Sequence, residues 1–146
     1  MDDAIHDAAS RFYAAANVVV RGDAGPMLAL WSSREDVTYA APNGEVVHGV
    51  KSLRTYWERA AELNRATPGM VSAMGEILVQ HEHGDTAYTV TIEHLSVTEG
   101  NQVRRLRARA SHVYRLEDGG WRLLHRHAEP PVPDVTPSTH PSEAAT

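Results

Sequence analysis

The sequence contains no cysteine. It can therefore form no disulfide, offer no thiolate nucleophile and build no cysteine-based metal site. It also has no apolar run near the roughly 20 residues that a membrane-spanning helix needs. Its first ten residues, MDDAIHDAAS, lack the basic and apolar regions of a secretory signal. These absences predict a cytoplasmic protein with no membrane partner.

Positive charge is also scarce, because 14 Lys and Arg stand against 19 Asp and Glu, for a net charge of -5 at pH 7. The basic run RRLRARA would place Arg105, Arg107 and Arg109 in one row on the outer face of a strand. The run lacks the interleaved aromatic residues of proteins that bind single-stranded nucleic acid. We therefore interpret this row as a solvated or dimer-facing surface and expect no nucleic-acid partner.

What the sequence does contain is an ordered series of periodic segments. Apolar residues recur at three- and four-residue spacing over 5–20, which predicts a helix, and a second, short helix is predicted over 22–31. A Pro-Asn-Gly turn at 42–44 joins two short β-prone runs, as in a small hairpin. A third helix is predicted to follow Gly49 and to stop at 67–69.

From residue 70 onward the pattern changes to four long strands separated by short polar turns. Consecutive strands with such turns predict an antiparallel meander. The expected fold class is α+β: a cone-shaped, curved antiparallel sheet of about four long strands plus a short hairpin, wrapped on three N-terminal helices. Residues 1–129 form the predicted domain. Residues 130–146 hold five of the eight prolines and are predicted to be a Pro-rich flexible tail.

A curved sheet wrapped on helices leaves a cavity at its open end, which is a common type of small-molecule site. Side chains alternate between the two faces of a strand. The face of the last strand that carries Trp121 and Leu123 is predicted to point inward, with Arg126 on the opposite face. The residues predicted to converge in the pocket are then His112, Tyr114, His125, His127 and Glu129.

Several segments spread over residues 5–129 carry a family resemblance. They are FYAAANVVVRGDAGPMLALW, YAAPNGEVVHG followed by LRTYW, and HVYRLEDGGWRLLHRHAE. In this order and spacing the chain resembles the nuclear transport factor 2-like superfamily, in particular its SnoaL-like and ketosteroid-isomerase-like branch. The resemblance implies a small homodimer with a conical pocket that works without a metal or organic cofactor. Members of the family isomerise, cyclise, dehydrate or hydrolyse small apolar molecules, while others only bind them.

The resemblance also suggests roles for single residues. His112 falls where the isomerases place an acidic hydrogen-bond donor, and His125 and His127 fall on pocket-lining positions. The general base of the isomerases is an Asp directly before the Pro of the first hairpin, but here Ala41 precedes Pro42. Steroid-type isomerisation by the usual residues is therefore not expected.

Two further differences concern the acid/base groups. The tyrosine donor of the isomerases should lie on the first helix near Ala15 or Ala16, and Tyr13 is predicted to point elsewhere if that helix is regular. The SnoaL cyclases use a pocket carboxylate, yet no Asp stands in the strands that we place around the pocket. Histidine would have to replace it, and its ordinary pKa of about 6.5 suits proton transfer near neutral pH.

These observations lead to one functional hypothesis with two alternatives. The chain is predicted to be a cofactor-free acid/base enzyme acting on a small apolar carbonyl or polyketide-like metabolite. His127 and His112 are the expected proton-handling pair, with His125 and Glu129 in support. The predicted substrate-binding residues are Trp31, Tyr39, Tyr56, Trp57, Tyr114 and Glu129. The alternatives are a non-catalytic ligand-binding or dimerisation module of the same fold, and a metal-dependent enzyme built on the histidine cluster.

The alternative readings of the histidines stay open at this point. His125 and His127 could simply bond backbone groups or lie in a dimer interface. No ligand spacing such as HExxH supports a metal, and we assign no metal ligand. His81 and His83 repeat the His-x-His pattern and are predicted to lie at an exposed strand end.

Overall fold

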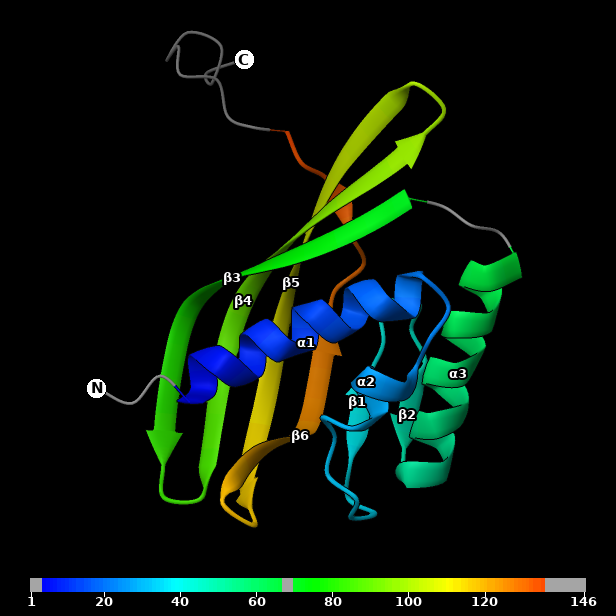
Figure 1. Cartoon of the computed structure of the whole chain (residues 1–146). Helices are drawn as coiled ribbons and strands as arrows, with labels where there is room; N and C mark the ends of the chain where they lie inside the picture. The colour runs from blue at the N-terminus through cyan, green and yellow to red at the C-terminus, as the bar shows by residue number, and fades with distance from the viewer. Residues whose placement is uncertain (1–3, 67–69, 136–146) are drawn as a thin grey trace, which may run out of the picture.

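Three helices cover one face of a single curved sheet (Figure 1). The computed structural model describes residues 4–66 and 70–135. The predicted stop of the third helix at 67–69 and the end of the predicted tail, 136–146, lie outside these residues. The helices are α1 (Ala4–Val20), α2 (Gly25–Leu28) and α3 (Val50–Ala66). No helix among the described residues has the length and apolar character needed to cross a membrane.

The sheet follows the order β2-β1-β6-β5-β4-β3, and β7 pairs with β5. Its strands are β1 (Thr38–Ala40), β2 (Val46–His48), β3 (Met70–His83), β4 (Thr86–Glu99), β5 (Gln102–Glu117), β6 (Gly120–Ala128) and β7 (Val132–Pro133). The predicted α+β cone with its antiparallel meander is confirmed. The hairpin β1–β2 joins the meander through a parallel pairing of β1 with β6 that the sequence did not predict.

A β-bulge in β6 decides which side chains enter the cone. Leu123 pairs with Tyr114 and His125 pairs with Val113, so Leu124 is an extra residue that reverses the alternation of faces. Beyond the bulge Arg126 and Ala128 are buried, whereas His127 is exposed. The prediction that His125, His127 and Glu129 share the inner face with Leu123 is therefore wrong, as is the outward placement of Arg126.

Helix α1 packs closely against the sheet because β3 carries a glycine beneath it. A Cβ atom on Gly75 would overlap the ring of Tyr13, so any other residue would force that ring or α1 to shift. The large side chains buried on this inner side include Ile5, Phe12, Met27, Trp31, Tyr39, Leu53 and Trp57. Full burial of each such apolar side chain contributes about 1.5–3 kcal/mol to folding.

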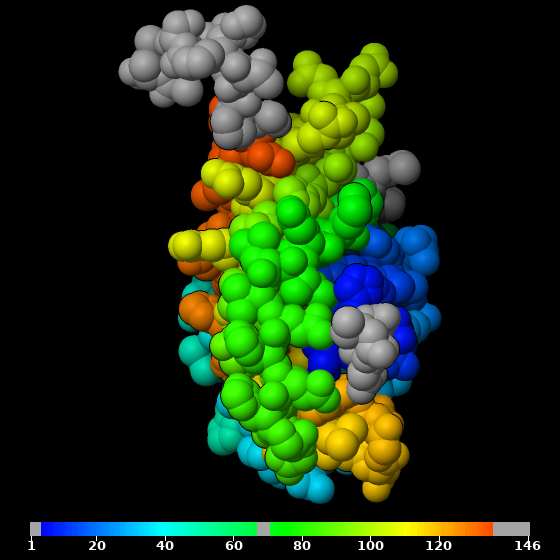
Figure 2. Space-filling model, turned by 90° about the vertical axis from the view of Figure 1, so that its left-hand side faces the viewer, coloured from blue at the N-terminus to red at the C-terminus, as the bar shows by residue number. Residues whose placement is uncertain are grey.

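The two ends of the sheet are β2 and β3. Figure 2 shows β3 along the exposed edge, with α1 to one side of it. After β6 the chain continues in the same direction along β5, where Pro133 pairs with Leu106, and the backbone N–H of Asp134 donates to the carbonyl of Arg105 (2.9 Å). Residues 130–135, at the start of the predicted tail, therefore lie against the sheet.

Candidate functional site

Four polar side chains from four different elements meet inside the cone. Tyr13 comes from α1, Glu93 from β4, His112 from β5 and Arg126 from β6, and all four are buried. We call these residues the buried polar cluster. Charged groups are seldom buried unless they are paired, so their contacts explain why the fold tolerates them.

The centre of the buried polar cluster is an ion pair. The Nη1 and Nη2 atoms of Arg126 donate to the two carboxylate oxygens of Glu93 at 2.5 and 2.9 Å. The Tyr13 hydroxyl donates to Oε2 of Glu93 at 2.8 Å. The guanidinium also lies 4.7 Å from the Phe12 ring centre and 5.4 Å from that of Tyr39. Bidentate bonding and cation–π contacts together offset much of the cost of burying both charges.

The contact with Arg126 also fixes the proton on the His112 ring. Nη1 of Arg126 lies 2.8 Å from Nε2 of His112. A guanidinium can only donate, so Nε2 accepts and the ring proton is on Nδ1. Burial and the Arg126 charge, with a smaller contribution from His125, hold the pKa of His112 well below 6.5. His112 is therefore neutral near pH 7.

Tyr114 connects the buried polar cluster to a cavity. Its hydroxyl lies 3.4 Å from Nδ1 of His112, so the ring N–H donates a long hydrogen bond to the phenol oxygen. The same side chain lines a cavity of about 270 Å³, which we call the β5–β6 cavity. The apolar part of its wall comes from Ala8, Phe12, Ala29, Leu30, Trp121 and Leu123, and the charged part from Arg11, Glu117, Asp118 and Arg122.

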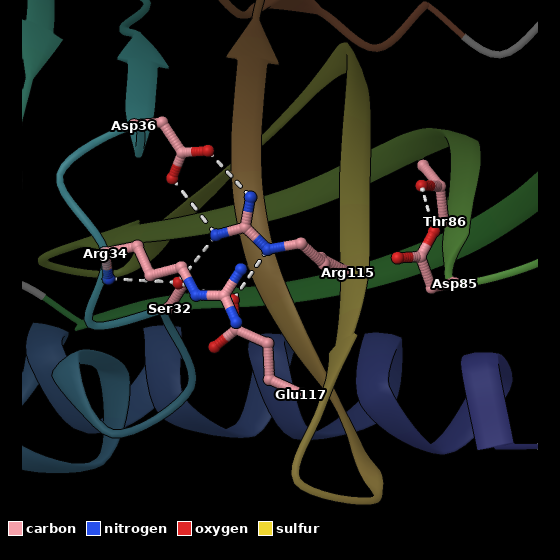
Figure 3. A network of polar contacts seen from close by, with 7 residues as sticks. All are labelled: Ser32, Arg34, Asp36, Asp85, Thr86, Arg115 and Glu117. Carbon is pink, nitrogen blue, oxygen red and sulfur yellow. Dashed lines mark hydrogen bonds and ion pairs between the residues drawn. The ribbon is translucent and has the colours of Figure 1, made fainter.

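A polar network holds one carboxylate in the wall of this cavity (Figure 3). Oε2 of Glu117 accepts from Ser32 Oγ and from Arg115 Nε, both at 2.7 Å, and Arg115 is also bidentate to Asp36. Among the described residues Oε1 of Glu117 has no partner. Burial alone would raise the pKa of Glu117, but the hydrogen bonds from Ser32 and Arg115 outweigh it and lower the pKa. Glu117 is therefore an ionised carboxylate with one free oxygen.

The histidines that were predicted to converge in one pocket lie on different faces of the sheet. His125 lies on the outer face of the sheet, where its Nδ1 is 2.6 Å from Thr38 Oγ1, and His127 is exposed beside it. Glu129 forms two hydrogen bonds of 2.8 Å with Arg109 on that face. The predicted pair of His112 and His127 is wrong, because the two side chains point to opposite faces of the sheet.

No three carboxylate or imidazole side chains among residues 4–66 and 70–135 are arranged to hold a metal ion. His81 and His83 are exposed at the end of β3, as predicted, with parallel rings 6.1 Å apart. Whether His125 or His127 takes part in catalysis stays a prediction, but neither can act together with His112 on one ligand.

The predicted aromatic walls fill the cone instead of lining its cavity. Tyr39 stacks on Trp57 at 5.4 Å, Tyr56 meets both rings edge-on, and Trp31 lies 6.1 Å from Tyr39. Of the side chains predicted to bind substrate, Tyr114 alone is among the lining residues of the β5–β6 cavity.

The sequence reasoning missed Glu93, Arg126 and Glu117 and placed Tyr13 wrongly. On β4 the inward side chains are Ala87, Thr89, Thr91 and Glu93, while the more apolar Tyr88, Val90 and Ile92 alternate with them on the outer face. Polarity alone therefore indicates the wrong face of this strand. The presence of one acidic residue, Glu93, and one basic residue, Arg126, in two strands of the sheet was a useful signal. A charged side chain that is buried in a sheet needs a partner of opposite charge.

Comparisons with known proteins agree with this geometry. The curved sheet with helices on one face is the architecture of the nuclear transport factor 2-like class of fold. The sequence profile of the SnoaL-like domain matches residues 5–133, so the chain belongs to the SnoaL-like family. Among curated protein sequences none matches it significantly.

Solved structures show the same fold at low identity. A proposed dehydratase from the NTF2-like family of Streptomyces avermitilis is 22% identical, with 88% of this chain and 94% of that chain covered and a TM-score of 0.70. A proposed calcium/calmodulin-dependent protein kinase type II association domain from Thiobacillus denitrificans is 22% identical, with 86% and 93% covered and a TM-score of 0.71. An NTF2-like protein with a cystatin-like fold from Novosphingobium aromaticivorans is 16% identical, with 94% and 83% covered and a TM-score of 0.70.

Proposed function

We propose that this protein is a cofactor-free enzyme that performs general acid/base chemistry on a small apolar carbonyl compound in the β5–β6 cavity. The observation that carries the proposal is the hydrogen-bond chain from Arg126 through His112 to Tyr114, which ends in the cavity wall near an ionised carboxylate, Glu117. Perturbed titratable groups that gather at a cavity are a common mark of catalytic sites.

The chain gives Tyr114 a defined role. Its oxygen accepts from His112 and has a further side-chain hydrogen-bond partner in Thr89, so the hydroxyl hydrogen can donate to a substrate oxygen. Burial raises the pKa of the Tyr114 phenol above its ordinary value, which keeps the hydroxyl protonated. A neutral donor in a partly buried wall stabilises the negative charge that develops on a carbonyl oxygen.

The reaction is a proton transfer next to that carbonyl. Oε1 of Glu117 removes a proton from the adjacent carbon, the electron pair of the C–H bond moves toward oxygen, and Tyr114 stabilises the enolate. Return of the proton to a conjugated carbon completes an isomerisation. Loss of a hydroxide from the β carbon, protonated as it leaves, completes a dehydration. Neither step needs a group beyond the substrate and this chain.

The simplest test is exchange of carbon-bound hydrogen in D₂O, followed by NMR with 2-tetralone and 1-indanone as substrates. The wild-type protein is expected to accelerate exchange next to the carbonyl. Tyr114→Phe and Glu117→Gln should each reduce the acceleration roughly 100-fold, within the range for general acid/base groups. His81→Ala, at the exposed end of β3, is the control and should exchange at the wild-type rate. Full activity in both cavity variants would refute the proposal.

One observation favours a second function, that of a non-catalytic binding or assembly module. The aromatic side chains and the buried polar cluster fill much of the cone, and the β5–β6 cavity, at about 270 Å³, is small for an enzyme pocket. Such a module would bind the same ketones without accelerating exchange.

We also propose that the protein is a homodimer formed through the outer face of the sheet. Large apolar side chains are exposed there, including Met74 (66%) and Tyr88 (38%). On the outer face of β4 they continue into Val90 and Ile92, so burial against a second copy would remove a contiguous apolar strip from water.

A further inference from the structure

The β5–β6 cavity has a cation in its wall that forms no ion pair with a described residue. Arg11 lies on α1 and lines the cavity together with Tyr114. Arg11 is exposed to solvent, and its guanidinium makes no hydrogen bond or ion pair with any described residue, although Asp7 stands one helical turn before it. A guanidinium in a cavity wall is a ready partner for a planar anion such as a carboxylate.

The other charged groups of this wall already form hydrogen bonds within the chain or lie in the turn between β5 and β6. Arg122 uses Nη1 to donate to the carbonyl of Ala29 (2.6 Å), and Glu117 is held by Arg115 and Ser32. Asp118 sits in the β5–β6 turn with a backbone φ of 51° and is exposed. Arg11 is therefore the cation of this wall that has no hydrogen-bond partner among the described residues.

We infer that the substrate of this cavity carries a carboxylate bound by Arg11, so that its chemical class is a small apolar keto acid. The inference rests on the proposed function for the carbonyl half of the ligand, since Tyr114 receives the ketone oxygen. Phe12 and Trp121 provide the apolar surface between the two polar contacts. The carboxylate then selects the ligand and orients its carbonyl, while the chemistry stays with Tyr114 and Glu117.

The size of the cavity agrees with such a molecule. Its volume of about 270 Å³ lies just below the range of roughly 300–1,000 Å³ that is usual for ligand pockets. A small molecule with one ring, one ketone and one carboxylate fits within a cavity of this size. The inference thus narrows the substrate from apolar carbonyl compounds in general to small monoanionic ones.

Binding is tested with phenylacetate and its neutral isostere phenylacetamide, measured by chemical-shift changes in an NMR titration. Wild-type protein is expected to bind phenylacetate at least tenfold more tightly than the amide. Arg11→Gln should abolish that preference, and Arg11→Lys should restore part of it because the charge returns. Arg21→Gln removes an exposed arginine just beyond the end of the same helix and should behave as wild type. An unchanged preference in Arg11→Gln, or no preference in the wild type, would overturn the inference.

Hydrogen exchange separates this inference from the proposed function. 3-Benzoylpropionate and butyrophenone share a ketone, but only the first carries a carboxylate. Arg11→Gln should raise the KM for 3-benzoylpropionate at least tenfold and leave the exchange of butyrophenone unchanged. If the wild type exchanges both ketones equally and Arg11→Gln alters neither, the inference fails while the proposed function stands. If phenylacetate binds through Arg11 but no ketone exchanges, the proposed function fails while the carboxylate site stands.

Discussion

A buried carboxylate and a buried guanidinium lie at the centre of this protein. Glu93 accepts three hydrogen bonds, two from Arg126 and one from Tyr13. Removing one member of such a pair is costly because the other charge is left buried without a partner. Glu93→Gln is therefore expected to lower the free energy of unfolding by about 3–5 kcal/mol in urea titrations. Glu76→Gln, at an exposed site on β3, is the matched control and should unfold like wild type. Equal stability of both variants would contradict the importance of this ion pair.

The lowered pKa of His112 makes a second prediction about pH. In the unfolded chain His112 gains a proton as the pH falls through about 6.5, whereas in the folded protein it stays neutral to a lower pH. The unfolded state then binds more protons, so stability is fully present above pH 6.5 and declines below it. His112→Gln should remove this part of the decline when melting temperatures are compared between pH 7.5 and 5. A parallel decline in wild type and variant would show that His112 is not buried neutral.

Single residues were also where prediction from sequence was least reliable. His112 and Tyr114 were placed on the inner face correctly, because β5 alternates regularly around them. Arg126, His125 and His127 were placed on the wrong faces, because one extra residue at Leu124 reverses the alternation and no local sequence signal marks a bulge. The direction of Tyr13 was predicted wrongly because its partner, Glu93, is 80 residues away, and the sequence of the helix alone does not indicate that contact.

At the scale of elements, the contact of α1 with β3 depends on a missing side chain. Gly75 leaves room for the Tyr13 ring, so Gly75→Ala is expected to displace that ring and destabilise the fold by about 1–3 kcal/mol. Gly120→Ala is the control, since its added Cβ would meet nothing closer than the Glu117 carbonyl oxygen at 4.0 Å. Thermal unfolding of both variants measures the difference. A Gly75→Ala protein as stable as Gly120→Ala would show that α1 does not need this close approach.

Helices and strands were the features that the sequence predicted best. The four long strands predicted from residue 70 onward are present, and the first of them, β3, begins at Met70, where the periodicity of the sequence changes. The parallel pairing of β1 with β6 could not be predicted, because strand alternation says nothing about which distant edge a short hairpin joins.

At the scale of the whole molecule, β4 bears on assembly because its more apolar side chains face outward and its polar side chains face inward. Its outer face carries Tyr88, Val90 and Ile92, which water would otherwise contact. We expect sedimentation analysis to find a homodimer, and Tyr88→Glu to shift it to monomer by placing a charge in the interface. Leu63→Glu, at an exposed apolar site on α3, is the control and should leave the dimer intact. A wild-type monomer would contradict the proposed interface.

The central claim is that Tyr114 donates a hydrogen bond to a carbonyl oxygen bound in the β5–β6 cavity. The most direct measurement is the ¹³C chemical shift of the labelled carbonyl carbon of 2-tetralone bound to the protein. Hydrogen bonding withdraws electron density from that carbon, so we predict a downfield shift on binding to wild-type protein that disappears in Tyr114→Phe. An identical shift of the bound ketone in wild type and Tyr114→Phe would contradict the claim.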